Sequence, residues 1–207
     1  MSSLRIAVFA SGTGSNCRAI HDAIVNGKLG AEIALIVSNN PQAGILAWAT
    51  EKGLTHICIA SEQFEDKKQF HDTLLKTLDL YHIQMIVLAG YMKKIGLPLI
   101  DAYPNKILNI HPALLPAFAG KGMYGEHVHK AVIDYGAKIT GVTVHLVDAE
   151  YDHGAIVMQR ALDVRDDDTP QSLAARVLAL EHETYYKAIQ LFAEKKIQIV
   201  DRKVITQ

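Results

Sequence analysis

The residues of this chain that are best suited to chemistry are Asn109 and His111, which one residue separates and Pro112 follows. Apolar residues around Asn109 predict a strand, and Pro112 ends it because proline has no amide hydrogen for a strand ladder. Side chains two residues apart on a strand share a face, so the carboxamide and the imidazole should lie together. Such a pair can donate to a developing oxyanion and move a proton, as acyl transfer requires. Asn and His near a proline are also common turn formers, so a purely structural role stays open.

Two further residues could act with this pair. Asp152 lies in an acidic turn, residues 148–154, where a tight bend could direct its carboxylate to the end of the sheet. A carboxylate placed there would favour the protonated form of any imidazole nearby. His145 stands in an apolar run at 139–147, where it should be buried and should need a hydrogen-bond partner. No metal is expected in the acidic turn, because no second group of ligands is spaced to complete a coordination sphere.

A glycine-rich turn, SGTGSN at residues 11–16, follows the first predicted strand and opens a helix. Backbone amides at such a turn, together with the helix dipole, favour a bound phosphate. A dinucleotide fingerprint is excluded, because Cys17 stands where the third glycine would be and the next strand ends without an acidic residue for a ribose. The turn therefore favours a phosphate monoester on a small substrate, and a plain strand-to-helix turn is the alternative.

Composition argues against several classes of function. The chain has 207 residues, 49% of them hydrophobic, and a net charge of −1, so it has no basic surface of the kind that binds nucleic acid. Small molecules are the expected partners. Cys17 and Cys58 have neither metal-ligand nor CxxC spacing, which indicates a reducing compartment and predicts a cytoplasmic protein. No apolar run reaches the roughly 18 residues of a membrane span, so no membrane partner is expected.

Strand and helix patterns alternate through the first half of the chain. Apolar runs predict strands at residues 4–10, 31–38, 55–59 and 84–88, and helical spacing follows at residues 42–52 and 64–80. Strands separated by helices form parallel sheets through right-handed crossovers. The predicted fold is therefore α/β: a Rossmann-like, doubly wound, mostly parallel sheet with helices on both faces.

The order of elements changes after His111. Residues 113–125 predict a long loop, of a kind that is usually functional or mobile. A helix follows that carries Val128, Ala131, Val132 and Tyr135. Residues 139–147 and 155–162 predict an antiparallel C-terminal pair of strands. Thr169 and Pro170 then open a long helix, and residues 197–200 predict a tail strand.

Six segments taken together resemble a known family. They are SGTGSN at 11–16, LAGYMKKI at 88–95, NIHPALLP at 109–116, HVH at 127–129, GVTVHLV at 141–147 and DHG at 152–154. The set is similar to the phosphoribosylglycinamide formyltransferases, within the wider formyltetrahydrofolate-dependent formyltransferase family. The resemblance covers essentially the whole chain. NIHPALLP and the Asp before HG indicate only the wider formyltransferase family. The SGTGSN turn narrows the resemblance to the phosphoribosylglycinamide formyltransferases within it.

The resemblance implies a role for each matching residue. The catalytic residues would be Asn109, His111 and Asp152, with the buried His145 behind them. In that arrangement Asp152 would lie near His111 and raise the pKa of its imidazole. The ribonucleotide would be bound by Gly14, Ser15, Asn16 and Glu181, and the folate by Lys67, Met92, Lys93, Lys94, Ile95 and Asn109. The family pattern has arginine at the positions of Lys67 and Lys93. Lysine keeps the charge but cannot make the planar, two-pronged contact with a carboxylate.

The activity implied by the resemblance is transfer of a formyl group from the co-substrate 10-formyltetrahydrofolate to the amine of phosphoribosylglycinamide, in de novo purine biosynthesis. One domain is expected over residues 1–207, with a ribonucleotide-binding half at 1–105 and a catalytic, folate-binding half at 106–207. A homodimer stays open. The alternatives are formyl transfer to another amine such as an amino sugar, hydrolysis of the formyl folate, and a dehydrogenase-like nucleotide-binding domain. The last of these leaves Asn109, His111 and Asp152 without a function.

Overall fold

The structure, a computed structural model, describes residues 3–206. The chain divides into two compact units, with the boundary between Leu108 and Asn109. Seven strands form one sheet in the order β3-β2-β1-β4-β5-β6-β7. Strand β5 (Ile107–His111) begins in the first unit and ends in the second. The predicted doubly wound, mostly parallel α/β fold is confirmed.

The first unit holds the parallel part of the sheet. Strand β1 (Leu4–Phe9) pairs in parallel with β2 (Ala31–Ser38) and with β4 (Met85–Leu88), and β2 pairs with β3 (His56–Cys58). The residues of β4 and most of those of β1 and β2 are buried. Strands covered on both faces consist of continuous apolar runs, which is why the sequence predicts them well.

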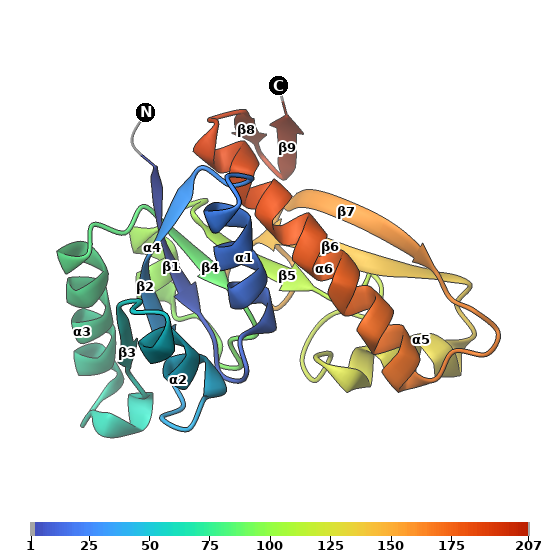
Figure 1. Ribbon diagram of the computed structural model, residues 1–207, viewed down its shortest axis with the longest axis horizontal. Helices are drawn as coiled ribbons and strands as arrows, with labels where there is room; N and C mark the ends of the chain where they lie inside the picture. Colours follow the sequence, from blue (N-terminus) through green and yellow to red (C-terminus); the bar gives the residue numbers. More distant parts are fainter. Residues whose placement is uncertain (1–2, 207) are drawn as a thin grey trace. The chain divides into compact units, whose positions relative to one another are not determined.

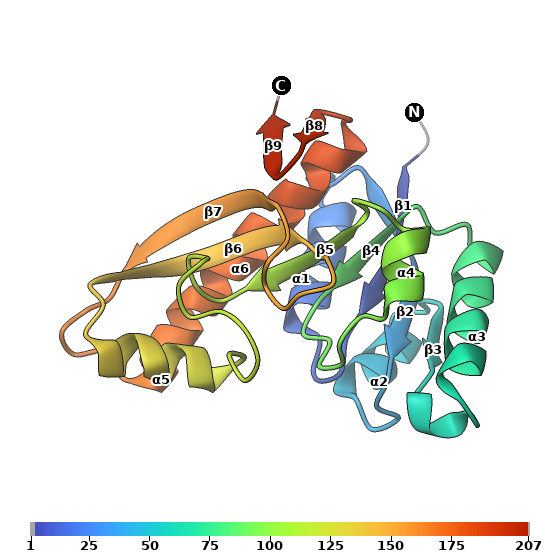
Figure 2. The same ribbon diagram turned by 180° about the vertical axis from the view of Figure 1, so that it is seen from behind.

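Helices cover both faces of these parallel strands. Figures 1 and 2 show α1 (Ser15–Val25) and α2 (Gly44–Glu51) on one face, and α3 (Lys67–Leu80) and α4 (Leu97–Ala102) on the other. The carboxyl ends of β1, β2 and β4 lie next to one another at one edge of the sheet, because these strands are parallel neighbours. Loops that follow such ends are the usual place for ligands in α/β folds.

Several predicted boundaries in this unit are wrong by a few residues. Helix α3 begins at Lys67, not at residue 64, because the side chain of Asp66 accepts a hydrogen bond from the Gln69 amide and caps the helix. A 3-10 turn, η1 (Ser61–Gln63), occupies part of the segment before it. The short helix α4 was not predicted, since six residues give too little periodicity to detect.

The second unit holds the antiparallel part of the sheet, as predicted. Strand β6 (Ile139–Leu146) pairs antiparallel with β7 (Ile156–Asp163). The other elements are α5 (Glu126–Tyr135), α6 (Pro170–Ala193) and a C-terminal hairpin of β8 (Ile197–Val200) and β9 (Lys203–Thr206). The cap of α6 at Thr169 is confirmed, because its side chain accepts a hydrogen bond from the Ser172 amide. Strand β9 was not predicted.

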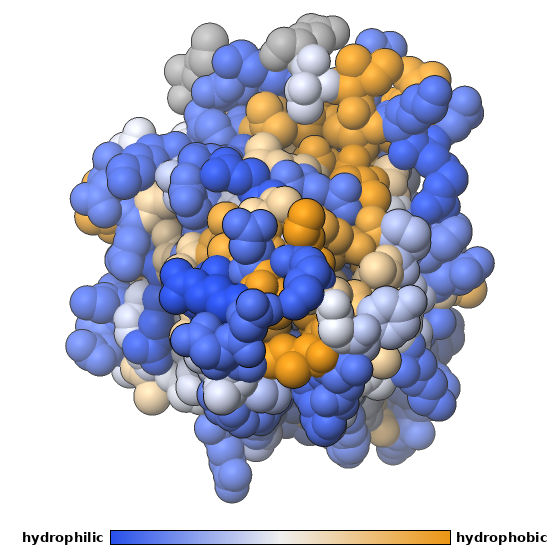
Figure 3. Space-filling model, turned by 90° about the vertical axis from the view of Figure 1, so that its right-hand side faces the viewer, coloured by the Kyte–Doolittle hydropathy of each residue, from blue (hydrophilic) through white to orange (hydrophobic). Residues whose placement is uncertain are grey.

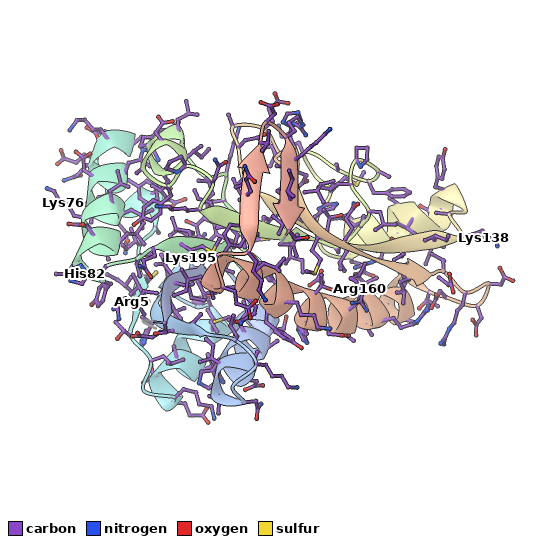
Figure 4. The ribbon with its side chains drawn as sticks, turned by 90° about the horizontal axis from the view of Figure 1, so that it is seen from above. Arg5, Lys76, His82, Lys138, Arg160 and Lys195 are labelled. Atoms are coloured by element: carbon purple, nitrogen blue, oxygen red, sulfur yellow. The ribbon has the colours of Figure 1, made fainter. Side chains whose placement is uncertain are left out.

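The core of the second unit lies between α5, α6 and the strands. It contains Ala113, Val128, Val132, Val142, Leu173 and Val177, all fully buried. Figure 4 shows the long α6 beside β7, with Lys195 just past its C-terminal end. Tyr135, the last residue of α5, is 83% exposed and lies outside this core. Figure 3 shows hydrophobic surface within hydrophilic surroundings on the side of the molecule where α5 lies.

Among residues 3–206 no helix combines the length and the apolar character needed to cross a bilayer. The expected single domain, with halves that meet at residues 105 and 106, stays a prediction.

Candidate active site

The end of β5 and the turn after β6 bring the predicted catalytic residues together within the second unit. Asn109 and His111 lie on β5, which ends at His111 as predicted. Asp152 Oδ1 lies 3.7 Å from Nδ1 of His111 and 3.7 Å from Nε2 of His145. Both imidazoles are 2% exposed. A carboxylate thus stands beside two buried imidazoles at the end of a strand.

Backbone geometry holds Asp152 in this place. Its φ of 52° is in the left-handed region, which Asp adopts more readily than most residues. Its Oδ2 accepts a hydrogen bond of 3.0 Å from the Gly120 amide. At Gly154 a Cβ atom would lie 1.9 Å from the Leu146 carbonyl oxygen, so only glycine fits there. The turn therefore packs closely against the end of β6 at Gly154. The Gly120 hydrogen bond and this close packing together hold Asp152 in place.

One contact determines which nitrogen of His111 carries the hydrogen. Nε2 lies 2.8 Å from the carbonyl oxygen of Phe118, and a carbonyl can only accept. Nε2 therefore donates, and the lone pair of the neutral ring is on Nδ1, the nitrogen nearer to Asp152. Phe118 has a φ of 52°, which is uncommon for an aromatic residue. Backbone strain of this kind is typical of functional sites.

Burial affects the pKa of His111 more than the charge of Asp152 does. Burial lowers the pKa of the imidazole, whereas the Asp152 charge and the Phe118 hydrogen bond raise it by less. The pKa of His111 thus lies below its ordinary value of 6.5. Asp152 acts in the expected direction but is the weaker influence. His111 is therefore mainly neutral at pH 7 and can accept a proton on Nδ1.

His145 orients the Asn109 amide. Its Nδ1 lies 2.8 Å from the Leu146 carbonyl oxygen and must donate, so Nε2 accepts from Asn109 Nδ2 at 3.1 Å. Burial is the main cause of the lowered pKa of His145, which keeps this ring neutral. The contact uses one of the two amide hydrogens of Asn109. Because the amide group is planar, this bond also fixes the direction of the second hydrogen, which can donate to an oxyanion.

Thr143 is a buried residue of this region that sequence reasoning missed. Its hydroxyl donates to the Ala113 carbonyl (2.7 Å) and accepts from the Leu115 amide (3.0 Å) and from Gln159 Nε2 (2.9 Å). Gln159 Nε2 also donates to the Leu115 carbonyl (3.0 Å). These bonds attach the segment that follows His111 to β6 and β7. A polar residue two positions before His145 on a buried strand was the available signal.

The glycine-rich turn lies in the first unit, at the carboxyl end of β1. Gly14 has a φ of 71° and is the N-cap of α1, and a Cβ there would lie 2.4 Å from Cδ1 of Ile45. Ser15 and Asn16 form the start of α1, at the positive end of the helix dipole. The described first turn of α1 has no acidic residue that would repel an anion. These features suit a phosphate, as the sequence predicts.

The predicted folate-binding segment, residues 92–95, also lies in the first unit. Met92 is 53% exposed, whereas Ile95 is buried and fixes the end of the segment. Lys93 Nζ forms an ion pair of 3.0 Å with Glu62, and this hydrogen bond is the main cause of the lowered pKa of Glu62. Lys94 and Lys67, the first residue of α3, are exposed. Exposed lysines of this kind can contribute only weakly to binding.

Glu181, the remaining ribonucleotide candidate, is 9% exposed on α6 in the second unit. Its role, like those of the other assigned residues, stays a prediction. Among residues 3–206, no group of three or more His, Cys, Asp or Glu side chains could hold a metal ion.

Known proteins share both the fold and the sequence pattern of these regions. The model of a family described as formyl transferase matches residues 4–189. The chain belongs to the formyl transferase family. The chain is 42% identical over 193 residues to the chloroplastic phosphoribosylglycinamide formyltransferase of Vigna unguiculata, covering 93% of the chain but only 62% of the length of that relative.

Two bacterial proteins match the chain over nearly their whole length. It is 37% identical over 186 residues to the phosphoribosylglycinamide formyltransferase of Bacillus subtilis, which covers 90% of the chain and 93% of the relative. The crystal structure of glycinamide ribonucleotide transformylase 1 from Symbiobacterium toebii has a TM-score of 0.92 and 36% identity, covering 99% of this chain and 94% of that one. The dehydrogenase-like alternative is thereby excluded.

Proposed function

We propose that the chain transfers the formyl group of 10-formyltetrahydrofolate to the amine of phosphoribosylglycinamide, as a step of purine biosynthesis. The observation that carries the proposal is the cluster of the buried His111 with the partly buried Asn109 and Asp152, in a chain whose relatives bear the name of this activity. Both substrates are small molecules. We further propose that the protein works in the cytoplasm as one domain, without nucleic acid, membrane or metal.

The proposed reaction begins when the neutral amine attacks the formyl carbon. The carbonyl oxygen becomes an oxyanion, to which the second amide hydrogen of Asn109 donates. His111 Nδ1 takes a proton from the amine nitrogen, because Nε2 already donates to Phe118. The imidazolium formed in this step is stabilised by the Asp152 carboxylate, 3.7 Å away.

The second half of the reaction returns the proton. His111 donates it to the folate nitrogen as the bond from that nitrogen to the formyl carbon breaks, and the tetrahedral carbon becomes the new formamide. No net proton is gained or lost. The 3.7 Å between Asp152 and His111 Nδ1 exceeds a direct hydrogen bond, so a water molecule or a substrate group can take part in this exchange.

The binding residues are proposed from the first unit and from α6. The amides of Gly14, Ser15 and Asn16 hold the phosphate, and Glu181 contacts the ribonucleotide. The exposed Met92 supplies apolar contact for the pterin, with Lys93, Lys94 and Ile95 in the same segment. Lys67 lies at the exposed start of α3, where it can meet the glutamate tail of the folate.

An acceptor assay tests the function. Purified protein is incubated with formyl-labelled 10-formyltetrahydrofolate and either phosphoribosylglycinamide, an amino sugar or buffer alone. We expect labelled formylglycinamide ribonucleotide in the first reaction and no labelled product above background in the other two. Labelled amino sugar would identify a different transferase, and free labelled formate in all three reactions would identify a hydrolase.

Replacing Gly14 by alanine should raise the KM for the ribonucleotide at least tenfold and change the KM for the folate little. The added Cβ meets Ile45 and displaces the backbone that approaches the phosphate. Gly27→Ala is the matched control, since Gly27 has a similar φ of 68° and no atom within 4 Å of the added Cβ. Steady-state kinetics with each substrate varied in turn measure both constants. Equal changes in the two KM values would contradict the phosphate assignment.

A further inference from the structure

Ser11 lies near the adjacent carboxyl ends of three neighbouring strands in the first unit. It follows β1, which stands between β2 and β4 in the sheet. The segments that leave the carboxyl ends of these strands are the turn 11–16, the pair Asn39 and Asn40, and residues 89–95. The first contains the proposed phosphate site and the last contains the proposed folate segment.

Four hydrogen bonds connect Ser11 to the two neighbouring segments. Its amide donates to the Gly90 carbonyl (3.0 Å), and its carbonyl accepts from Asn40 Nδ2 (3.2 Å). Its hydroxyl accepts from the Met92 amide (2.8 Å). The same hydroxyl lies 2.5 Å from Asn39 Oδ1, an atom that can only accept, so the hydroxyl hydrogen is donated there.

The Ser11 hydroxyl connects the turn to Met92, and the backbone hydrogen bonds of Ser11 do not. The bonds to Gly90 and Asn40 use main-chain atoms of Ser11 and would survive removal of the side chain. The bond from the Met92 amide depends on the hydroxyl alone, and it joins the first residue of the SGTGSN turn to the first residue of the folate segment. Asn39 fixes the direction of the hydroxyl so that its lone pair faces Met92.

We propose that Ser11 is a positioning residue that couples the two substrate sites, so that the ribonucleotide and the folate each tighten the binding of the other. The inference rests on the proposed function, which places one substrate on each segment. Phosphate binding at Gly14 to Asn16 fixes the turn that begins at Ser11. Because the Ser11 hydroxyl accepts from the Met92 amide, phosphate binding also orders the Met92 backbone. The folate then binds a segment that is already ordered and does not pay the entropy cost of ordering it. Such coupling acts equally in both directions.

Calorimetric titration of a dead-end complex tests the coupling. Tetrahydrofolate, which has no formyl group to transfer, is titrated into the protein with and without saturating phosphoribosylglycinamide. For the unmodified protein we expect the ribonucleotide to lower the tetrahydrofolate Kd at least fivefold, within the usual range of coupling between sites. The reverse titration should give the same factor.

Three variants of Ser11 and one control variant separate coupling from simple loss of stability. Ser11→Ala should reduce the coupling factor to near one while each ligand alone still binds, and Ser11→Thr, which keeps the hydroxyl, should restore it. Ser11→Cys has nearly the size of serine but a weakly accepting thiol, so it gives the same readout if the alanine variant does not fold. Ser172→Ala, which removes a hydroxyl from the α6 cap, is the control and should keep the coupling.

Unchanged coupling in Ser11→Ala, or in Ser11→Cys if the alanine variant does not fold, would overturn the proposal, as would its absence from the unmodified protein. Failure of the proposed function is a different result: the unmodified protein would then transfer no formyl group to phosphoribosylglycinamide in the acceptor assay.

Discussion

Replacing His111 by glutamine should lower kcat for formyl transfer about a thousandfold. Glutamine keeps a donor that can reach the Phe118 carbonyl, but it cannot take a proton from the attacking amine or return it to the folate nitrogen. General acid–base catalysis by one side chain typically contributes about a hundredfold to ten thousandfold, which sets this magnitude. Because the ribonucleotide and folate residues are unchanged, both KM values should change little.

The matched control for this variant is His56→Gln. His56 is a partly buried histidine on β3 whose Nδ1 also lies near a backbone carbonyl, that of Leu54 at 2.9 Å. Its replacement should leave kcat within about threefold, since His56 has no proposed contact with either substrate. Circular dichroism and thermal melting establish that both variants fold. A His111→Gln protein that keeps a tenth of the kcat of the unmodified protein would remove His111 from the proton transfer.

Replacing Asp152 by asparagine should lower kcat about a hundredfold or more and leave ribonucleotide binding intact. Asparagine retains an oxygen that can accept from the Gly120 amide, so the turn should keep its shape. The negative charge beside His111 is lost. Because that charge raises the pKa of His111 against the effect of burial, its removal should lower this pKa further. The imidazolium that forms during proton transfer is then less stable.

The pKa of His111 provides a direct readout of this effect. In the unmodified protein an NMR titration of the ring should give a pKa below 6.5. The pH profile of kcat/KM should fall on the acid side of that pKa, since protonation removes the base. In Asp152→Asn the NMR pKa should be lower still. Asp148→Asn, in the same turn but ion-paired with the more exposed His153, is the control and should leave the pKa of His111 nearly unchanged. An unchanged pKa in Asp152→Asn would show that Asp152 has another role.

Much of the fold and part of the candidate site could be predicted from the sequence, for physical reasons. Pro112 ends β5, and the period of two on a strand places Asn109 and His111 on one face. The continuous apolar runs of β1, β2 and β4 indicate strands covered on both sides. The position of Asp152 beside His111 came from the resemblance to a family, because no local pattern determines where a turn some forty residues away will lie.

Other features of the site depend on contacts that a sequence does not encode in a local pattern. The tautomer of His111 is set by a backbone carbonyl, at Phe118, and every residue has one. The direction of the His111 pKa shift is a balance between burial and charge, and the degree of burial is known only from the fold. The links made by Thr143 and Ser11 join segments that are far apart in the chain, so neither could be found by spacing alone.

The central claim is that His111 and Asp152 act as one unit in the proton transfer, and a double-variant cycle tests it most directly. Single-turnover formyl transfer is measured for the unmodified protein, His111→Gln, Asp152→Asn and the protein with both changes. If Asp152 acts through His111, the double variant should transfer at the rate of His111→Gln alone, within about threefold, because residues that act as a unit are not additive. A double variant whose loss is the product of the two single losses would contradict the claim.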